Sequence, residues 1–228
     1  MLREELLRGD LTVDGLEKRV TKLRIVPVVV LEDANDALPL CDALMAGGLP
    51  IAEVTFRTEA AAEAIALIRK ERSDILVGAG TVLTSEHVFR AADVGAAFVV
   101  TPGFNPKVVS AAFECGLSII PGVNSPTQVE MAMASGCRLL KFFPAAASGG
   151  LAMLKALSGP YKDVRFVPTG GVNPENLAEY LSLDNVAACG GSWMVEKELI
   201  ADKDFESVVK LVCQATEIVR TVPLPPNS

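Results

Sequence analysis

Histidine is almost absent from this sequence, and its absence excludes several kinds of chemistry. His87 is the only histidine among the 228 residues. A zinc or iron site built mainly from imidazoles is therefore excluded, and a Ser-His-Asp triad would depend on this single residue. The segment TSEHVF places His87 at an apparent helix start, where we expect it to lie at the surface. Any chemistry must rest on lysine, carboxylate, arginine or tyrosine side chains, or on a bound cofactor.

Cysteine is scarce and lacks the spacing of a metal or redox motif. The five cysteines are scattered, odd in number and contain no C-x-x-C pair. This pattern indicates reduced thiols and predicts a cytoplasmic protein. Because the single histidine is expected at the surface, none is available to activate a thiol, so we do not expect a catalytic cysteine, and we expect no metal site.

Positive charge and long apolar segments are lacking as well. The chain has 21 Lys and Arg against 28 Asp and Glu, a net charge of −7. This balance argues against nucleic acid and anionic membrane surfaces as partners. No apolar stretch approaches the length of a transmembrane helix, and the start MLREELLRGD lacks the apolar centre of a signal peptide. A local phosphate site made by backbone N–H groups is still compatible with this charge.

Small aliphatic residues are abundant. Half of the residues are hydrophobic and only 5% are aromatic. Apolar strand-like runs alternate with Ala-rich helical segments, which is typical of an α/β protein with a parallel sheet covered by helices. The strand-like runs are 25–31, 51–57, 75–80, 98–103, 117–123, 139–145, 165–171 and 185–191.

Eight β-then-α units of roughly 20–26 residues predict a (β/α)8 TIM barrel. No linker divides the chain, so we expect one domain over residues 1–228, with a helical lead-in at 1–23 and a flexible tail at 221–228. The competing architecture is a doubly wound open sheet. We favour the barrel because no G-x-G-x-x-G motif follows the first strand.

One lysine stands inside an apolar run. Lys141 is flanked by Leu140 and Phe142 in the segment LLKFFP, where a buried parallel strand is expected. Burial disfavours the ammonium form, so we expect a lowered pKa and a neutral amine that can form a Schiff base with a carbonyl. The alternative is a snorkelling lysine or a structural ion pair.

Two further charged residues are predicted to face this lysine. Strand alternation places Glu53, Thr55 and Arg57 on one side of the second strand. The arrangement predicts Lys141 as nucleophile, Glu53 as proton shuttle and Arg57 as a fork for a substrate carboxylate. A structural ion pair in the barrel core is the alternative, although burying such charges without purpose is costly.

Glycine pairs end the seventh and eighth strands, in PTGG and CGGS. The loops after these strands often form a phosphate site in barrels. We expect backbone N–H groups of Gly170, Gly171, Gly191 and Ser192 to surround one anion. Tight turns also use glycine pairs, so one pair alone is a weak signal. Because no Walker loop is present, a nucleotide is not expected.

Two longer motifs are more specific. GLPIAEVTFR (48–57) and GCRLLKFFPAAASGG (136–150) resemble the active-site signatures of the 2-keto-3-deoxy-6-phosphogluconate (KDPG) and 4-hydroxy-2-oxoglutarate (KHG) aldolases. The segments GAGTVL, VTPGFNP, IPGVNSPTQ, VRFVPTGGVNPEN and GGSW are also similar to that family, so the similarity extends from about 20 to 215. The resemblance implies a class I aldolase of the Entner–Doudoroff pathway. It also implies a homotrimer of single-domain barrels without metal or cofactor.

The resemblance implies residue roles as well. Lys141 would form the Schiff base and Glu53 would move protons. The other family positions would bind pyruvate (Arg57, Thr81), line the pocket (Pro102, Phe143), affect aldehyde stereochemistry (Thr169) or hold the phosphate (Gly170, Gly171, Ser192). One position departs from the family pattern: many members carry Glu after KFFPA, whereas this chain has Ala146. This departure leaves Lys141 and Glu53 unchanged, and we expect it to affect the packing of the loop or the preference for the aldehyde acceptor.

The implied reaction is cleavage of KDPG to pyruvate and glyceraldehyde 3-phosphate, together with cleavage of 4-hydroxy-2-oxoglutarate to pyruvate and glyoxylate. Three alternatives stay open: the 6-phosphogalactonate epimer as substrate, a mainly unphosphorylated substrate, and a non-catalytic phosphosugar-binding barrel. The joint presence of Lys141, Glu53 and Arg57 argues against the last.

Overall fold

Parallel strands form the centre of the protein. The computed structural model describes residues 13–224, in which six strands form a curled parallel sheet of order β5-β4-β3-β2-β1-β9. A smaller parallel sheet has the order β6-β7-β8. The strands are β1 (Ile25–Val29), β2 (Ile51–Thr55), β3 (Leu76–Gly80), β4 (Phe98–Val100), β5 (Ser118–Ile120), β6 (Gly122–Val123), β7 (Leu139–Phe142), β8 (Arg165–Pro168) and β9 (Cys189–Gly191).

The larger sheet is a half-barrel, and the predicted α/β class with parallel strands is confirmed. Pro121 alone separates β5 from β6, and isolated bridges link Phe166 to Val186 and Thr169 to Gly190. The last predicted strand, 185–191, was too long. Its first half forms one isolated bridge, made of two hydrogen bonds with Phe166, and β9 itself covers three residues.

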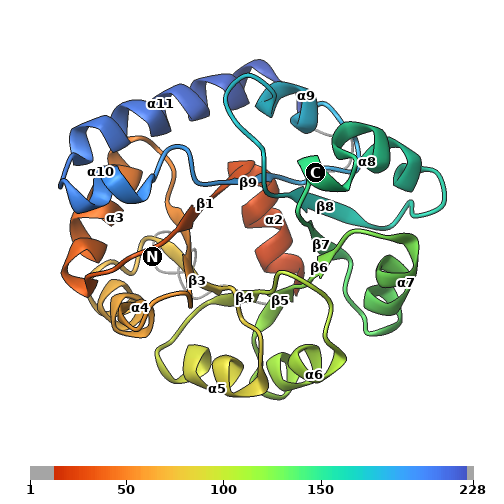
Figure 1. Cartoon of the computed structure of the whole chain (residues 1–228), viewed down its shortest axis with the longest axis horizontal. Coiled ribbons are helices and arrows are strands. Elements are labelled where there is room, and N and C mark those ends of the chain that lie inside the picture. Colours follow the sequence, from red (N-terminus) through yellow and green to blue (C-terminus); the bar gives the residue numbers. More distant parts are fainter. Residues whose placement is uncertain (1–12, 225–228) are drawn as a thin grey trace, which may run out of the picture.

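Helices surround the strands (Figure 1). Except between β5 and β6, helices separate successive strands along the chain, as the alternating sequence pattern predicts. The helices of the described residues are α2 (Val13–Leu23), η1 (Ala34–Asp36), α3 (Ala37–Ala46), α4 (Ala60–Glu71), α5 (Ser85–Asp93), α6 (Pro106–Glu114), α7 (Pro126–Ala134), η2 (Ala146–Ser148), α8 (Gly150–Ser158), α9 (Leu177–Leu181), α10 (Lys197–Ala201) and α11 (Phe205–Thr221).

The two ends of the chain lie partly outside the described residues. Within the predicted lead-in, α2 is a helix, and residues 1–12 are not described. The predicted tail begins at the last residue of α11, and Arg24 then donates hydrogen bonds to the carbonyls of Val222 and Pro223 at 2.8 and 2.7 Å. Residues 225–228 are not described.

No helix within residues 13–224 combines the length and the apolar character that crossing a membrane requires.

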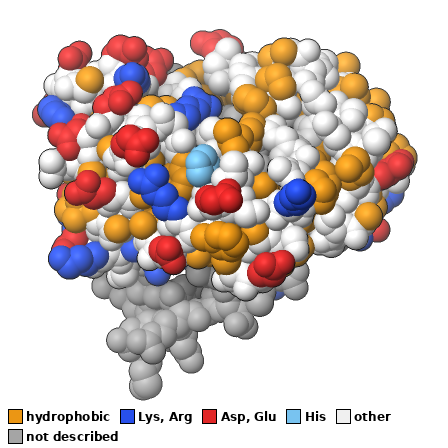
Figure 2. Space-filling model, turned by 60° about the horizontal axis from the view of Figure 1, so that its bottom comes forward, with side chains coloured by type: hydrophobic (Ala, Val, Ile, Leu, Met, Phe, Trp, Pro, Cys, Tyr) orange, Lys and Arg blue, Asp and Glu red, His pale blue; other side chains and the backbone are white. Residues whose placement is uncertain are grey.

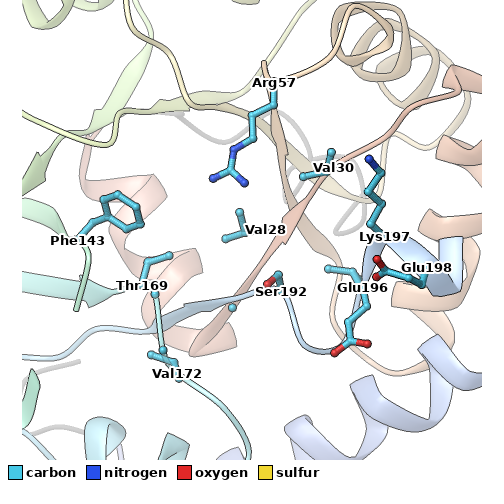
Figure 3. A pocket seen from close by; sticks show the side chains of 14 residues that line it. Val28, Val30, Arg57, Phe143, Thr169, Val172, Ser192, Glu196, Lys197 and Glu198 are labelled. Atoms are coloured by element: carbon cyan, nitrogen blue, oxygen red, sulfur yellow. The ribbon is translucent and has the colours of Figure 1, made fainter. Parts of the chain in front are cut away.

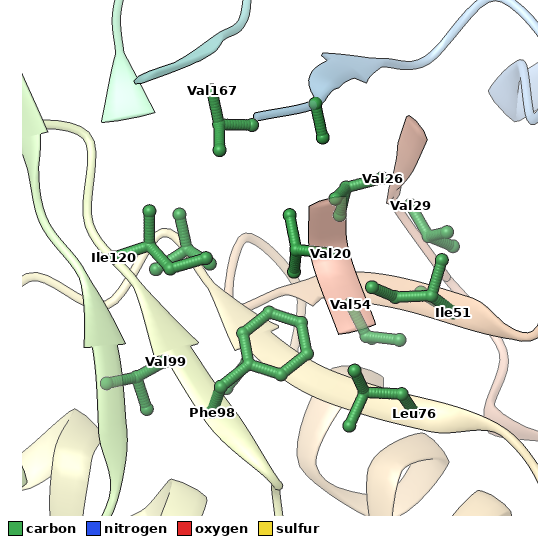
Figure 4. Packing of buried hydrophobic residues seen from close by; sticks show 14 of the residues in the cluster. Val20, Val26, Val29, Ile51, Val54, Leu76, Phe98, Val99, Ile120 and Val167 are labelled. Atoms are coloured by element: carbon green, nitrogen blue, oxygen red, sulfur yellow. The ribbon is translucent and has the colours of Figure 1, made fainter. Parts of the chain in front are cut away.

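Buried aliphatic residues fill the space between α2 and the strands (Figure 4). Val20 of α2 is fully buried in the same cluster as Val26 and Phe98. The ring of Phe98 occupies the space that a side chain at Gly78 would need. Because a single residue separates α2 from the start of β1, and α2 contacts both β1 and β5, it lies at the end of the sheet where the strands begin. The candidate site lies at the opposite end, where the strands finish.

Candidate active site

A lysine and a glutamate meet inside the protein. Lys141 is the third residue of β7 and Glu53 the third residue of β2, so each comes from a different sheet. The Lys141 Nζ lies 3.2 Å from Oε1 of Glu53, and the two side chains are only 7% and 4% exposed. The two side chains therefore face each other, as the sequence predicts. At this distance a proton can pass directly between amine and carboxylate.

The position of Glu53 depends on a glycine of the neighbouring strand. A Cβ atom at Gly80 would overlap the Glu53 carboxylate. Thr55, on the same side of β2 as Glu53, donates its hydroxyl to the carbonyl of Val29 at 2.9 Å and so helps to hold β2 against β1. Sequence reasoning missed the role of Gly80, although the segment GAGT was noticed. The contact between this glycine and the carboxylate of the neighbouring strand can be recognised only when the pairing of β2 with β3 is known.

Gly80→Ala is expected to push the Glu53 carboxylate away from Lys141. A displacement of about 1 Å at reacting groups lowers kcat by about 10²-fold, and we expect a loss of this size. Steady-state kinetics and thermal unfolding of the variant measure it. Gly103→Ala is the matched control, because a Cβ there meets nothing within 4 Å. A folded Gly80→Ala protein with unchanged kcat would contradict the assignment.

A pocket of about 510 Å³ opens where the strands end (Figure 3). Arg57 extends into it from the end of β2, and Thr169 and Ser192 face it from the ends of β8 and β9. Within residues 15–224 the Arg57 guanidinium has no ion pair, so it is free to bind a carboxylate. The predicted site residues that line the pocket are Arg57, Phe143, Thr169, Gly170, Gly171, Gly191 and Ser192.

Four predicted site residues are not among the residues that line this pocket. Lys141 and Glu53 are buried, and the link from Lys141 to the pocket is Phe143, whose ring centroid lies 5.3 Å from Nζ. Thr81 directly follows β3 with a φ of 54°, and Pro102 packs its backbone against Gly122. The structure therefore places Thr81 and Pro102 at strand ends, as predicted, but not on the wall of the pocket.

The glycine-rich turns present unused N–H groups. Gly170 and Gly171 have φ angles of 94° and 85°, which glycine adopts readily. The bridge between Thr169 and Gly190 brings the two turns together. In the described part of the chain, the N–H groups of Gly171 and Ser192 donate to no backbone carbonyl. Converging N–H groups without acceptors are the usual basis of an anion site.

The same glycines are also required for packing. A Cβ at Gly191 would overlap the ring of Trp193, and a Cβ at Gly171 would lie 2.5 Å from the Cβ of Ala146. Ala146, the position that departs from the family pattern, thus packs against one of the two turns. Substitution of these glycines would disturb the fold together with any anion site.

Three charged residues of the pocket were missed by the sequence reasoning. Glu196, Lys197 and Glu198 line the pocket beside Ser192 (Figure 3). Lys197 forms an ion pair with Glu32 at 2.7 Å, and this carboxylate raises the pKa of the lysine. Their position two residues after GGSW, beyond the end of the last strand, was the signal available in the sequence.

Histidine and cysteine take no part in the site. The single histidine, His87, lies at the surface (Figure 2), with its ring in edge contact with Phe56 at 5.7 Å. All five cysteines are free. Burial raises the pKa of Cys41 to about 12 and that of Cys137 to about 11, so both thiols stay protonated at neutral pH. Among residues 13–224 no group of three or more His, Cys, Asp or Glu side chains could hold a metal ion.

Comparison with known proteins identifies the family. A profile of the KDPG and KHG aldolases matches residues 16–211. The chain belongs to this family. KDPG and KHG aldolases are carbon–carbon lyases, and the resemblance noticed in the two active-site motifs is confirmed.

Individual members of the KDPG and KHG aldolase family are similar over most of their length. The 2-dehydro-3-deoxy-phosphogluconate aldolase of Treponema pallidum is 54% identical, over 87% of this chain and 94% of its own. The KHG/KDPG aldolase of Escherichia coli K12 is 40% identical, over 88% and 94%. A KDPG aldolase from Legionella pneumophila, whose crystal structure holds pyruvate captured at low pH as a covalent carbinolamine intermediate, superposes with a TM-score of 0.85. That structure is 40% identical and covers 87% of this chain and 97% of its own.

Proposed function

We propose that this protein is a class I aldolase that cleaves KDPG to pyruvate and glyceraldehyde 3-phosphate, and 4-hydroxy-2-oxoglutarate to pyruvate and glyoxylate. The observation that carries the proposal is the contact of 3.2 Å between the buried Lys141 amine and the Glu53 carboxylate. Membership of the aldolase family supports it. The decisive experiment is mass spectrometry after borohydride reduction in the presence of pyruvate, because only an imine is trapped in this way.

The first half of the reaction forms the imine. Lys141 in its neutral form attacks the carbonyl at carbon two, giving a carbinolamine. Glu53 accepts the proton that the amine loses and returns one to the departing hydroxyl, which leaves as water. The protonated imine that results withdraws electrons from the neighbouring carbon. Burial of both groups keeps water from competing with these proton transfers.

The second half breaks the carbon–carbon bond. A base removes the proton of the hydroxyl on carbon four, the bond between carbons three and four breaks, and the aldehyde leaves. The electron pair of that bond forms an enamine on Lys141. Protonation of carbon three and hydrolysis of the imine then release pyruvate and restore the amine. We assign these proton transfers to Glu53, with an ordered water where the distance requires one.

Arg57 is assigned to the carboxylate of pyruvate. Arg57→Ala is expected to lower kcat/KM by about 10- to 10²-fold, chiefly through KM, because a charge-assisted fork to the carboxylate is lost in ground state and transition state alike. Initial rates over a range of substrate concentrations measure the effect. Arg57→Lys is the matched variant and should recover only part of the loss. A large fall in kcat at unchanged KM would instead place Arg57 in the chemical steps.

Ser192 and the neighbouring N–H groups are assigned to the phosphate. Ser192 is exposed to the pocket, so Ser192→Ala tests the anion site without the overlaps that a glycine substitution causes. We expect kcat/KM for KDPG to fall about tenfold, the contribution of one hydrogen bond to a charged group. Activity toward 4-hydroxy-2-oxoglutarate, which has no phosphate, is the internal control and should be unchanged. Equal losses on both substrates would remove the phosphate assignment.

Thr81, Pro102, Phe143 and Thr169 complete the proposed substrate site. Thr81 is assigned to pyruvate, Pro102 and Phe143 to the pocket wall, and Thr169 to the stereochemistry of the aldehyde. Phe143 and Thr169 line the pocket, which supports their assignment. The competing substrate is the 6-phosphogalactonate epimer. Coupled assays with the two sugar-acid epimers, run on the same preparation, decide between them.

We also propose the finer architecture and setting of the enzyme. A single closed (β/α)8 barrel is supported by the direct continuation of β5 into β6 and by the bridges between β8 and the β9 segment. A homotrimer acting in the cytoplasm, within the Entner–Doudoroff pathway, is the expectation from the family resemblance. Sedimentation of the purified protein tests the trimer, whose mass should be three times the 24.1 kDa of one chain.

A further inference from the structure

A second pocket, of about 500 Å³, lies at the opposite end of β8 from the active site. It is formed where α8 and α9 lead back into the strands, whereas Thr169 and the glycine turns lie where the strands finish. Arg165, the first residue of β8, is part of its wall. No step of the aldolase reaction involves this end of the molecule.

The wall of this pocket carries an excess of positive charge. Lys155, Lys162 and Arg165 line it, against one carboxylate from Asp184. Among the described residues none of the three cations takes part in an ion pair. Since the whole chain has a net charge of −7, a local group of three unpaired cations is not explained by composition.

Arg165 in particular lacks partners. Its Nε and Nη2 atoms are buried and have no hydrogen-bond acceptor in the described part of the protein. Arg24 lies close by and is fully buried, and its guanidinium donates only to main-chain carbonyls, among them that of Leu181 at 2.6 Å. Burial lowers the pKa of Arg24, and the charge of Arg165 lowers it further. Two neighbouring guanidinium groups therefore have no carboxylate between them.

We propose that this second pocket binds a small multivalent anion, a metabolite that carries phosphate or several carboxylates. The volume suits a small molecule, and the guanidinium and two ammonium groups suit such oxygen-rich groups. An anion here neutralises the Arg165 charge, which no side chain of the described chain does. The site does not rest on the aldolase assignment, because it shares no residue with the active-site pocket.

Titration calorimetry with two probes tests the site. Inorganic pyrophosphate and citrate are each titrated into the full-length protein, which separates phosphate from carboxylate ligands. The double variant Lys155→Gln, Lys162→Gln is then compared with the parent. Both lysines are exposed, so the variant should fold. Loss of two charge contacts should weaken binding of the preferred probe about tenfold, while aldolase activity stays unchanged.

A charge-matched control and a localised readout make the result decisive. The double variant Lys107→Gln, Lys210→Gln removes two exposed lysines elsewhere and should bind the probe like the parent. Hydrogen exchange should slow over residues 155–165 and 182–185 when the probe is bound. The proposal is overturned if neither probe binds at millimolar concentration, or if both double variants bind alike. It is also overturned if protection appears only around the glycine turns of the active site.

Discussion

Lys141→Met is expected to abolish aldol cleavage, with kcat reduced by about 10⁴-fold or more. The reaction as proposed passes through a covalent imine, and no other side chain in the site can replace a nucleophilic amine. Pyruvate and borohydride should therefore add one reduced pyruvyl group to the parent protein and none to the variant. Intact-mass measurement followed by peptide mapping should place the group on Lys141.

The buried partner makes a fold control necessary for this variant. Removing the ammonium leaves the Glu53 carboxylate buried without its ion pair, which is destabilising. Thermal unfolding should accompany the assay, and Lys107→Met, at an exposed position, is the matched control. An adduct on another lysine, or an active Lys141→Met protein, would refute the Schiff-base assignment and leave the ion pair a structural feature.

Glu53→Gln is expected to separate imine formation from turnover. The amide keeps the shape of the carboxylate but accepts no proton, so kcat should fall by about 10²–10⁴-fold, the usual contribution of general acid–base catalysis. Borohydride should still trap pyruvate on Lys141, only more slowly. Rapid-quench trapping alongside steady-state rates measures both quantities on one sample.

Glu63→Gln is the matched control for this experiment, because Glu63 lies exposed on α4. It should leave both rates unchanged. If Glu53→Gln turned over at close to the parent rate, another group would have to move the protons. If it formed no imine at all, Glu53 would be required to activate the amine rather than to serve the later steps.

The order of strands and helices could be predicted from the sequence, whereas the details of pairing could not. Apolar runs separated by Ala-rich helical segments predict an α/β protein because each run is hydrophobic on both faces. The breaks in the sheet have local causes. Pro121 has no N–H to donate, so the fifth strand divides into β5 and β6. The segment before β9 is as apolar as a strand, yet it forms only one isolated bridge, with two hydrogen bonds to Phe166.

The candidate site shows the same division. Strand alternation correctly brought Glu53 and Lys141 together, since both must face inward if the sheet curls. Gly80 was missed because it matters through the side chain it lacks, which leaves room for the Glu53 carboxylate. Glu196, Lys197 and Glu198 were missed because a charged run after a strand normally indicates only a solvated loop. Thr81 and Pro102 were predicted to bind substrate; they lie at strand ends but do not line the pocket, and their role in binding stays a prediction.

The ion pair between Lys141 and Glu53 joins residues 88 positions apart, one from each sheet. Neither sheet alone holds a reactive pair, so the chemistry appears only when the two have docked. The rate at which refolding protein becomes able to trap pyruvate would therefore report the rate of docking. Its time course can be compared with that of circular dichroism, which follows helix formation. A lag between the two signals would measure the time between formation of the helices and docking of the two sheets.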